Sequence, residues 1–216
     1  MVAKSTNADS SDGDRGQAFT LEGVVGAIII LTAVVFALQS VVITPTTSGS
    51  VNPDVRQELQ TEANDVLATA GQNETFGLQD YVLYWSQSTQ RYAGSINQRV
   101  GYGSRTPPGN FGNLLLTTFS QRGRTYNVEF RYLTNETNRT KSVPFVYRGQ
   151  PSDDAVTATY RVTLYDNQTL TAPGSPRVEI WQYDTDPTNN EDGYYPIPNA
   201  IDGPVYNIVE VRLTVW

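Results

Sequence analysis

An uncharged apolar run near the N-terminus constrains the fold of this chain more than any other feature. From Gly23 the sequence reads GVVGAIIILTAVVFALQSVVI and contains no formal charge. A helix of about 20 such residues, rising 1.5 Å per residue, spans the ~30 Å hydrocarbon core of a bilayer. The run therefore predicts one transmembrane helix over residues 21–43.

A cleaved secretory signal and a buried core helix both fit this run less well. A secretory signal has an apolar stretch of about 7–15 residues before small residues at a cleavage site, whereas this run is longer and passes through ALQS at residues 37–40. A buried core helix would need neighbours that cover it on all sides. Lys4 and Arg15 precede the run and no basic residue occurs in 44–55, so we expect residues 1–20 in the cytoplasm and the large C-terminal part outside the cell.

The sequence after the run predicts a breaker-rich linker and one α+β domain. Residues 44–52 contain Pro, Gly, Ser and Thr and form the expected linker; residues 53–216 form the expected extracellular domain. Asn52-Pro53 and Gly71 are start and stop signals for a helix. Apolar residues recur between them at helical spacing, so this short helix is expected to be amphipathic and to pack on a sheet.

Alternating or β-branched stretches predict a mainly antiparallel sheet in the rest of the domain. A further short helix is expected over 110–121 and a turn at 166–168. Two helices followed by strands favour the α+β class. The predicted strands cover residues 81–85, 125–133, 143–147, 155–165, 177–183 and 206–216.

The composition argues against several kinds of chemistry. The chain has no Cys and no His, so it lacks thiol ligands, disulfides and the commonest general base. A net charge of −7 without a basic stripe argues against nucleic-acid partners. The acidic surface, with two lysines among fifteen basic residues, is typical of a halophilic surface protein, although an ordinary acidic extracellular domain is the alternative.

The stretch RGQAFTLEG, residues 15–23, leads directly into the apolar run. A basic residue, a small residue, a short polar stretch and one Glu resemble the processing site of archaeal type IV pilin-like proteins. Together with FALQSVVITP at residues 36–45 and YVLYW at residues 81–85, the stretch is similar to an uncharacterised family of haloarchaeal pilin-like membrane proteins. The resemblance implies a pilin-like fold and no established activity or cofactor.

The resemblance also implies processing and assembly. A prepilin peptidase would cut after Gly16 and leave Gln17 as the mature N-terminus, and Glu22 would pair with the N-terminal amine of a neighbouring subunit. Such a pair offsets the ~2.5–3.5 kcal/mol cost of a carboxylate within the membrane. Glu22 would then be the sixth mature residue, whereas the usual pilin position is the fifth.

Glu22 can also be explained without a partner. With Thr20 as N-cap, the carboxylate would lie in the first turn of a helix, where the helix dipole favours negative charge. The sequence leaves assembly and interface roles for Glu22 open.

Two features of the C-terminal part have possible ligands or modifications. The acidic stretch 184–193 has oxygen ligands for calcium but lacks EF-hand spacing, so a solvated loop is preferred and no metal site is expected. Four Asn-x-Thr sequons follow the apolar run, only slightly more than chance would give, and because all four lie in predicted turns we expect at least one to be glycosylated. They begin at Asn73, Asn135, Asn138 and Asn167.

These observations favour a structural or assembly role over two alternatives. The first hypothesis is a type IV pilin-like subunit, of the major or the minor kind, that contacts other pilins through its apolar helix and is handled by pilus or secretion assembly machinery. The second is an unprocessed surface binding domain held by a signal anchor. A membrane-tethered enzyme is the third, and it is not expected because no catalytic constellation occurs.

Overall fold

The computed structural model describes residues 11–39, 53–135, 139–188 and 191–216. The chain divides into two compact units, Met1–Gly49 and Ser50–Trp216. The first contains helix α1 (Ser11–Gln39), and the second contains every other helix and strand. The predicted linker, residues 44–52, lies outside the described residues.

The transmembrane prediction for residues 21–43 is wrong in this structure. Helix α1 begins ten residues before the predicted start, and its described part ends at Gln39, before the predicted end. The side chains of α1 are described for residues 20–36, which cover roughly 25 Å of helix. Within the described parts of the chain, no helix combines the length and the apolar character that a membrane crossing requires.

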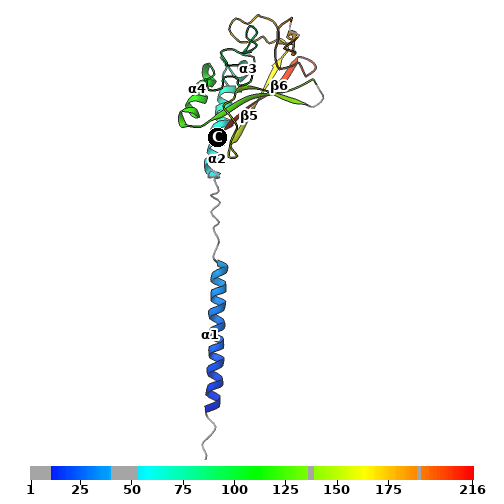
Figure 1. The fold of residues 1–216 in the computed structure, drawn as a ribbon. Helices are drawn as coiled ribbons and strands as arrows, with labels where there is room; N and C mark the ends of the chain where they lie inside the picture. The colour runs from blue at the N-terminus through cyan, green and yellow to red at the C-terminus, as the bar shows by residue number, and fades with distance from the viewer. Residues whose placement is uncertain (1–10, 40–52, 136–138, 189–190) are drawn as a thin grey trace, which may run out of the picture. The chain divides into compact units, whose positions relative to one another are not determined.

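Helix α2 (Pro53–Gly71) confirms the predicted amphipathic helix. Asp54 lies in its first turn, where the helix dipole favours an acidic residue. One face of α2 packs against the sheet, chiefly on its last strand pair, as Figure 1 shows beside β5. That face consists of the buried residues Leu59, Ala63, Val66, Leu67 and Ala70.

A four-stranded antiparallel sheet forms the other layer of the C-terminal unit, in the order β4-β3-β6-β5. The predicted strands 125–133, 155–165 and 206–216 are confirmed, and β4 begins before the predicted 143. A separate two-stranded sheet pairs β1 (Trp85–Ser86) with β2 (Arg91–Tyr92). The four strands are β3 (Tyr126–Leu133), β4 (Thr140–Val146), β5 (Val156–Tyr165) and β6 (Val205–Val215).

Strict alternation places one face of this sheet in the core. Buried residues alternate with partly exposed ones along the whole of β3, as expected for a strand with one covered face. The inward residues of the two central strands are all at most 7% exposed. They are Tyr126, Val128, Phe130 and Tyr132 on β3, and Val209, Val211, Leu213 and Val215 on β6.

Side chains and loops cover both edges of the sheet. On β5, the Gln60 side-chain amide donates to the Thr157 carbonyl at 3.0 Å, and Gln79 donates to the Thr163 carbonyl. On β4, the backbone N–H of Tyr102 donates to the carbonyl of Phe145 at 2.8 Å. Covered edges do not offer a free ladder to another strand.

Residues 81–85, predicted as a strand, begin instead within helix α3 (Leu78–Val82). The Asp80 carboxylate accepts a hydrogen bond from the Gly77 backbone N–H at 2.8 Å and so caps the helix. Leu78, Tyr81 and Val82 are buried at i, i+3 and i+4. A continuous apolar run is compatible with both a strand and a helix. The hydrogen bond between Asp80 and Gly77 favours the helix here.

The predicted strand 177–183 is also wrong, because this stretch forms only a short 3-10 turn, η2 (Ile180–Gln182). An isolated bridge joins Thr169 to Glu179. The segment has no edge to extend, since β5 pairs with β6 on one side and is capped by Gln60 and Gln79 on the other. In contrast, the predicted helix 110–121 is confirmed as α4 (Gly109–Thr118) followed by the 3-10 turn η1 (Ser120–Arg122).

Gly101 is expected to be essential for the cover of the β4 edge. Its φ is +57°, and a Cβ there would lie 2.0 Å from the Phe145 carbonyl oxygen. Gly123 is a matched control, because its φ of +73° is also left-handed but a Cβ would meet nothing within 4 Å. We expect Gly123→Ala to lower the free energy of unfolding by about 1 kcal/mol and Gly101→Ala by roughly 3 kcal/mol.

Urea unfolding followed by tryptophan fluorescence measures both losses. Equal losses for the two variants would contradict the close backbone approach at Gly101.

Candidate functional site

Large apolar side chains are exposed on all sides of α1. Their exposed fractions run from 43% at Val35 to 77% at Phe36. An apolar surface of this extent marks a binding surface in a folded protein. It comprises Leu21, Val24, Val25, Ile28, Ile29, Ile30, Leu31, Val34, Val35 and Phe36.

The predicted processing and assembly residues all belong to α1. Gly16 and Gln17 have helical backbone, and Glu22 is exposed. Glu22 lies well inside the helix, which begins at Ser11, so the prediction that Thr20 caps the helix is wrong. In the full chain Glu22 is therefore not in the first turn of the helix, and the helix dipole does not explain its position. Its carboxylate lies among the residues of the apolar surface instead.

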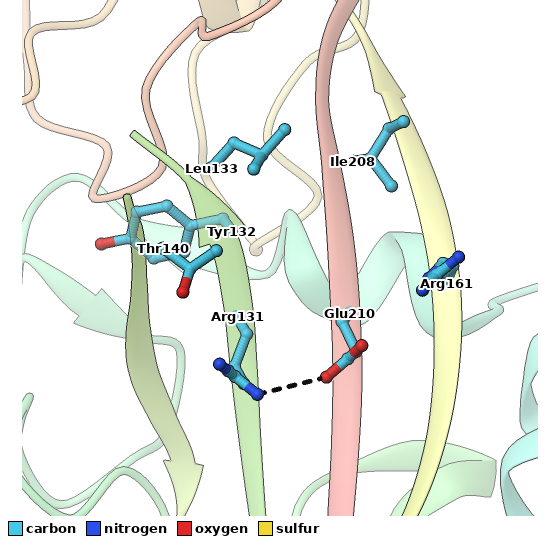
Figure 2. Close-up of a pocket in the computed structure, with 7 residues that line it drawn as sticks. All are labelled: Arg131, Tyr132, Leu133, Thr140, Arg161, Ile208 and Glu210. Atoms are coloured by element: carbon cyan, nitrogen blue, oxygen red, sulfur yellow. Dashed lines mark ion pairs between the residues drawn. The ribbon is translucent and has the colours of Figure 1, made fainter. Parts of the chain in front are cut away.

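A second candidate surface is the side of the four-stranded sheet that faces away from α2, which we call the open face. Charged side chains pair across its strands. A guanidinium nitrogen of Arg131 on β3 lies 3.6 Å from a carboxylate oxygen of Glu210 on β6. Figure 2 draws this ion pair as a dashed line. A guanidinium nitrogen of Arg212 on β6 lies 3.4 Å from a carboxylate oxygen of Glu129 on β3. Each pair is partly exposed, so each contributes only about 0.2–1 kcal/mol to stability.

Arg161 adds a further positive charge to the open face. It is directly opposite Glu210 in the register of β5 and β6, so Glu210 lies between Arg131 and Arg161 on neighbouring strands. Arg161 is exposed and makes no ion pair within the described parts of the chain. On β3, β6 and β5 together, the open face thus has three arginines and two glutamates.

A hollow of about 380 Å³ lies over one end of the open face. Leu133 and Ile208 form its apolar part, with Ile208 42% exposed. In Figure 2 these two side chains lie beyond the Arg131–Glu210 pair along the strands. Apolar side chains next to arginines suit a partner that combines apolar and acidic groups. The hollow is lined by Arg131, Tyr132, Leu133, Thr140, Arg161, Ile208 and Glu210.

The predicted sequons lie in three different places. Asn135 and Asn167 are exposed, and Asn135 lines a second hollow of about 400 Å³ with Tyr132 and Tyr194. Asn73 is half-buried, and its side-chain oxygen accepts the backbone N–H groups of Thr75 and Phe76 at 3.0 Å after the end of α2. Asn138 lies outside the described residues. Among the described residues, the three sequons share no hydrogen bond and no hollow.

The acidic stretch 184–193 contains a local turn. The Asp186 carboxylate accepts the backbone N–H of Thr188 at 2.8 Å, and the backbone N–H of Asp184 donates to the Gly193 carbonyl at 2.9 Å. Residues 189–190 of this stretch lie outside the described residues. Among the described residues, no group of three or more acidic side chains is placed to hold a metal ion.

The charged pairs of the open face were not predicted from the sequence. The outward positions of β3 and β6 contain Glu129, Arg131, Glu210 and Arg212 in the order Glu-x-Arg on both strands. This repeated pattern is visible in the sequence. Which residues pair depends on the strand register, which places Glu129 opposite Arg212 and Arg131 opposite Glu210.

Tyrosines behind the open face are expected to make the domain sensitive to alkali. Burial, followed by the neighbouring Tyr194, raises the pKa of Tyr132 to about 12. The pKa values of Tyr92 and Tyr195 are raised too, mainly by burial. In the unfolded chain these phenols ionise near pH 10, so their contribution to stability is complete below pH 10 and is lost as pH rises toward 12.

We expect the urea midpoint to fall as pH is raised from 9 to 11, and to fall less steeply in Tyr132→Phe. Tyr165→Phe is the control, because that ring is 44% exposed. Identical pH slopes for the wild type and Tyr132→Phe would contradict the raised pKa of Tyr132.

Comparison with known proteins identifies a family and no relative of known function. No curated protein and no solved structure matches the chain significantly. A protein family described as "Family of unknown function (DUF7288)" matches residues 15–215. The match includes the stretch from Arg15 to Glu22 as well as both candidate surfaces. The chain therefore belongs to the family of unknown function DUF7288.

Proposed function

We propose that this protein is a type IV pilin-like structural subunit of a cell-surface assembly, of the major or the minor kind, in which the apolar surface of α1 packs against helices of other subunits. The observation that carries the proposal is the exposure of large apolar side chains on all sides of α1. Within the first unit, no other described element packs against this surface. In the proposed assembly, pilin helices of the same or another kind cover it.

Three further features support the proposal. In the C-terminal unit one helix packs on an antiparallel sheet, an arrangement compatible with a pilin head. RGQAFTLEG resembles a prepilin processing site, so a prepilin peptidase and pilus or secretion assembly machinery are the proposed partners. Asn135 and Asn167 are exposed, which suits glycosylation of a head outside a halophilic archaeal cell.

The hollow of the open face favours a second candidate function. A surface domain that is never processed could bind a ligand there, between Ile208 and Arg161. Such a protein would keep its N-terminal segment and would not assemble. The state of the N-terminus therefore separates the two candidates.

Processing after Gly16 is the first expected outcome. The protein isolated from native membranes should begin at Gln17, and Gly16→Val should block this cleavage because the peptidase requires a small residue before the cut. Gly23→Val is the matched control, since a Cβ at Gly23 meets nothing within 4 Å, and it should leave the N-terminus at Gln17. N-terminal sequencing and intact mass measure the result.

An intact N-terminal segment in the wild type would overturn the pilin proposal and leave the binding domain. If the wild type and Gly16→Val are both cleaved, the cut lies at another bond. A mature N-terminus other than Gln17 would contradict the processing roles of Gly16 and Gln17.

Glu22 is expected to support contacts between α1 helices. An unpaired carboxylate within an apolar interface is costly, whereas one paired with a neighbour's N-terminal amine is not. The chain has no Cys, so Ala27→Cys, at an exposed position of α1, reports contacts by disulfide cross-linking in native membranes. We expect Glu22→Gln to lower the yield of cross-linked dimer roughly tenfold.

Glu74→Gln, a neutralisation at an exposed position of the C-terminal unit, controls for the change in net charge and should leave the yield unchanged. Equal yields in wild type and Glu22→Gln would contradict the pairing.

A further inference from the structure

The outer face of α2 has a stripe of acidic side chains. Asp54, Glu58, Glu62 and Asp65 follow one another at intervals of four, four and three residues, which places them on one side of the helix. Glu62 forms an ion pair with Arg122, whereas Glu58 and Asp65 are exposed. The stripe is a rigid, negatively charged surface.

The arginines of the open face match this stripe in charge and in spacing. Arg131 and Arg161 flank Glu210 on strands two apart, which separates them by about 10 Å. Glu58 and Asp65 are seven residues apart on a helix, which separates them by about 10.5 Å. A helix lying across the strands would therefore bring each carboxylate to an arginine.

Thr61 completes the match, because it lies between Glu58 and Asp65 on the helix surface and is exposed. In the same docking it comes opposite Glu210, which already has Arg131 as its partner. A neutral side chain at this position avoids a repulsion between two carboxylates, and Glu62, which lies beside Thr61 in the stripe, has Arg122 as its partner.

The two surfaces cannot meet within one copy. The apolar face of α2 packs on the inner face of the sheet, so its acidic stripe points away from the sheet. The outward residues of β3 and β6 alternate with core residues and point to the opposite side. One copy thus presents the stripe on one side and the open face on the other.

We propose that the open face of one copy binds the acidic stripe of α2 in a second copy. Such a contact joins two different surfaces, so it is heterologous and adds copies in one direction, as a filament requires. It would be a contact between heads in the assembly proposed above, and it presupposes that structural role. The charge pairs set the register and orientation of neighbouring heads.

Single cysteines on separate copies test this contact in the full-length chain. One copy has Thr61→Cys, beside the stripe, and a differently tagged copy has Thr159→Cys, an exposed position on the open face of β5. The two are co-expressed and treated in native membranes with a short thiol-to-thiol cross-linker. We expect covalent dimers that contain both tags.

Thr117→Cys with Thr159→Cys is the matched control. Thr117 of α4 is exposed, and its hydroxyl donates to the Asn113 carbonyl at 2.9 Å, as the Thr61 hydroxyl does to the Gln57 carbonyl. This pair should give no dimer above background. If the Thr61–Thr159 pair gives no more dimer than this control, the proposal is wrong. Dimers between two Thr159→Cys copies would also overturn it, because they would show that two open faces meet.

Charge reversal tests whether the arginines carry the contact. Arg161→Glu in the Thr159→Cys copy should lower the dimer yield roughly threefold to tenfold, and added salt should lower it in the same direction. Glu58→Arg or Asp65→Arg in the other copy should restore it, and the one that does so gives the direction of the helix across the strands. No restoration by either variant would overturn the charge pairing.

Failure of this contact is distinguishable from failure of the proposed function. If Ala27→Cys cross-links form between α1 helices and the Thr61–Thr159 pair does not react, the contact between heads is wrong and the subunit role stands. If neither forms and the N-terminus is intact, both are wrong.

Discussion

The packing of α2 on the inner face of the four-stranded sheet is the interaction on which the C-terminal unit depends. Leu59, Val66 and Leu67 supply one layer, and the inward residues of β5 and β6 supply the other. Burial of such side chains stabilises a fold by about 1.5–3 kcal/mol each. Because α2 covers one side of the sheet only, the alternation along each strand also produces the charged open face.

The two units use apolar side chains in opposite ways. In the C-terminal unit they are buried against each other, and both sheet edges are covered by Gln60, Gln79 and the loop at Gly101. In α1 they remain exposed on all sides. The C-terminal unit therefore has a core of its own, whereas the described part of the first unit is a single helix without one.

Most elements with a clear period could be predicted from the sequence. The alternation in β3, β5 and β6 and the helical spacing in α2 each indicated the observed element, because one face of each is buried in the core. The prediction failed at 81–85, where an apolar run has no period and the Asp80 cap selects a helix. It failed again at 177–183, where a strand-like pattern has no free sheet edge beside it.

By itself, the sequence determined the class of the C-terminal unit, the apolar character of α1 and the motif from Arg15 to Glu22, because these depend on local periodicity and residue type. Only the tertiary structure decided which charges meet. Glu129 pairs with Arg212 and Arg131 with Glu210, each across about eighty residues of chain, through the register of β3 and β6. That register follows from burying every inward side chain at once, a condition that no single segment contains.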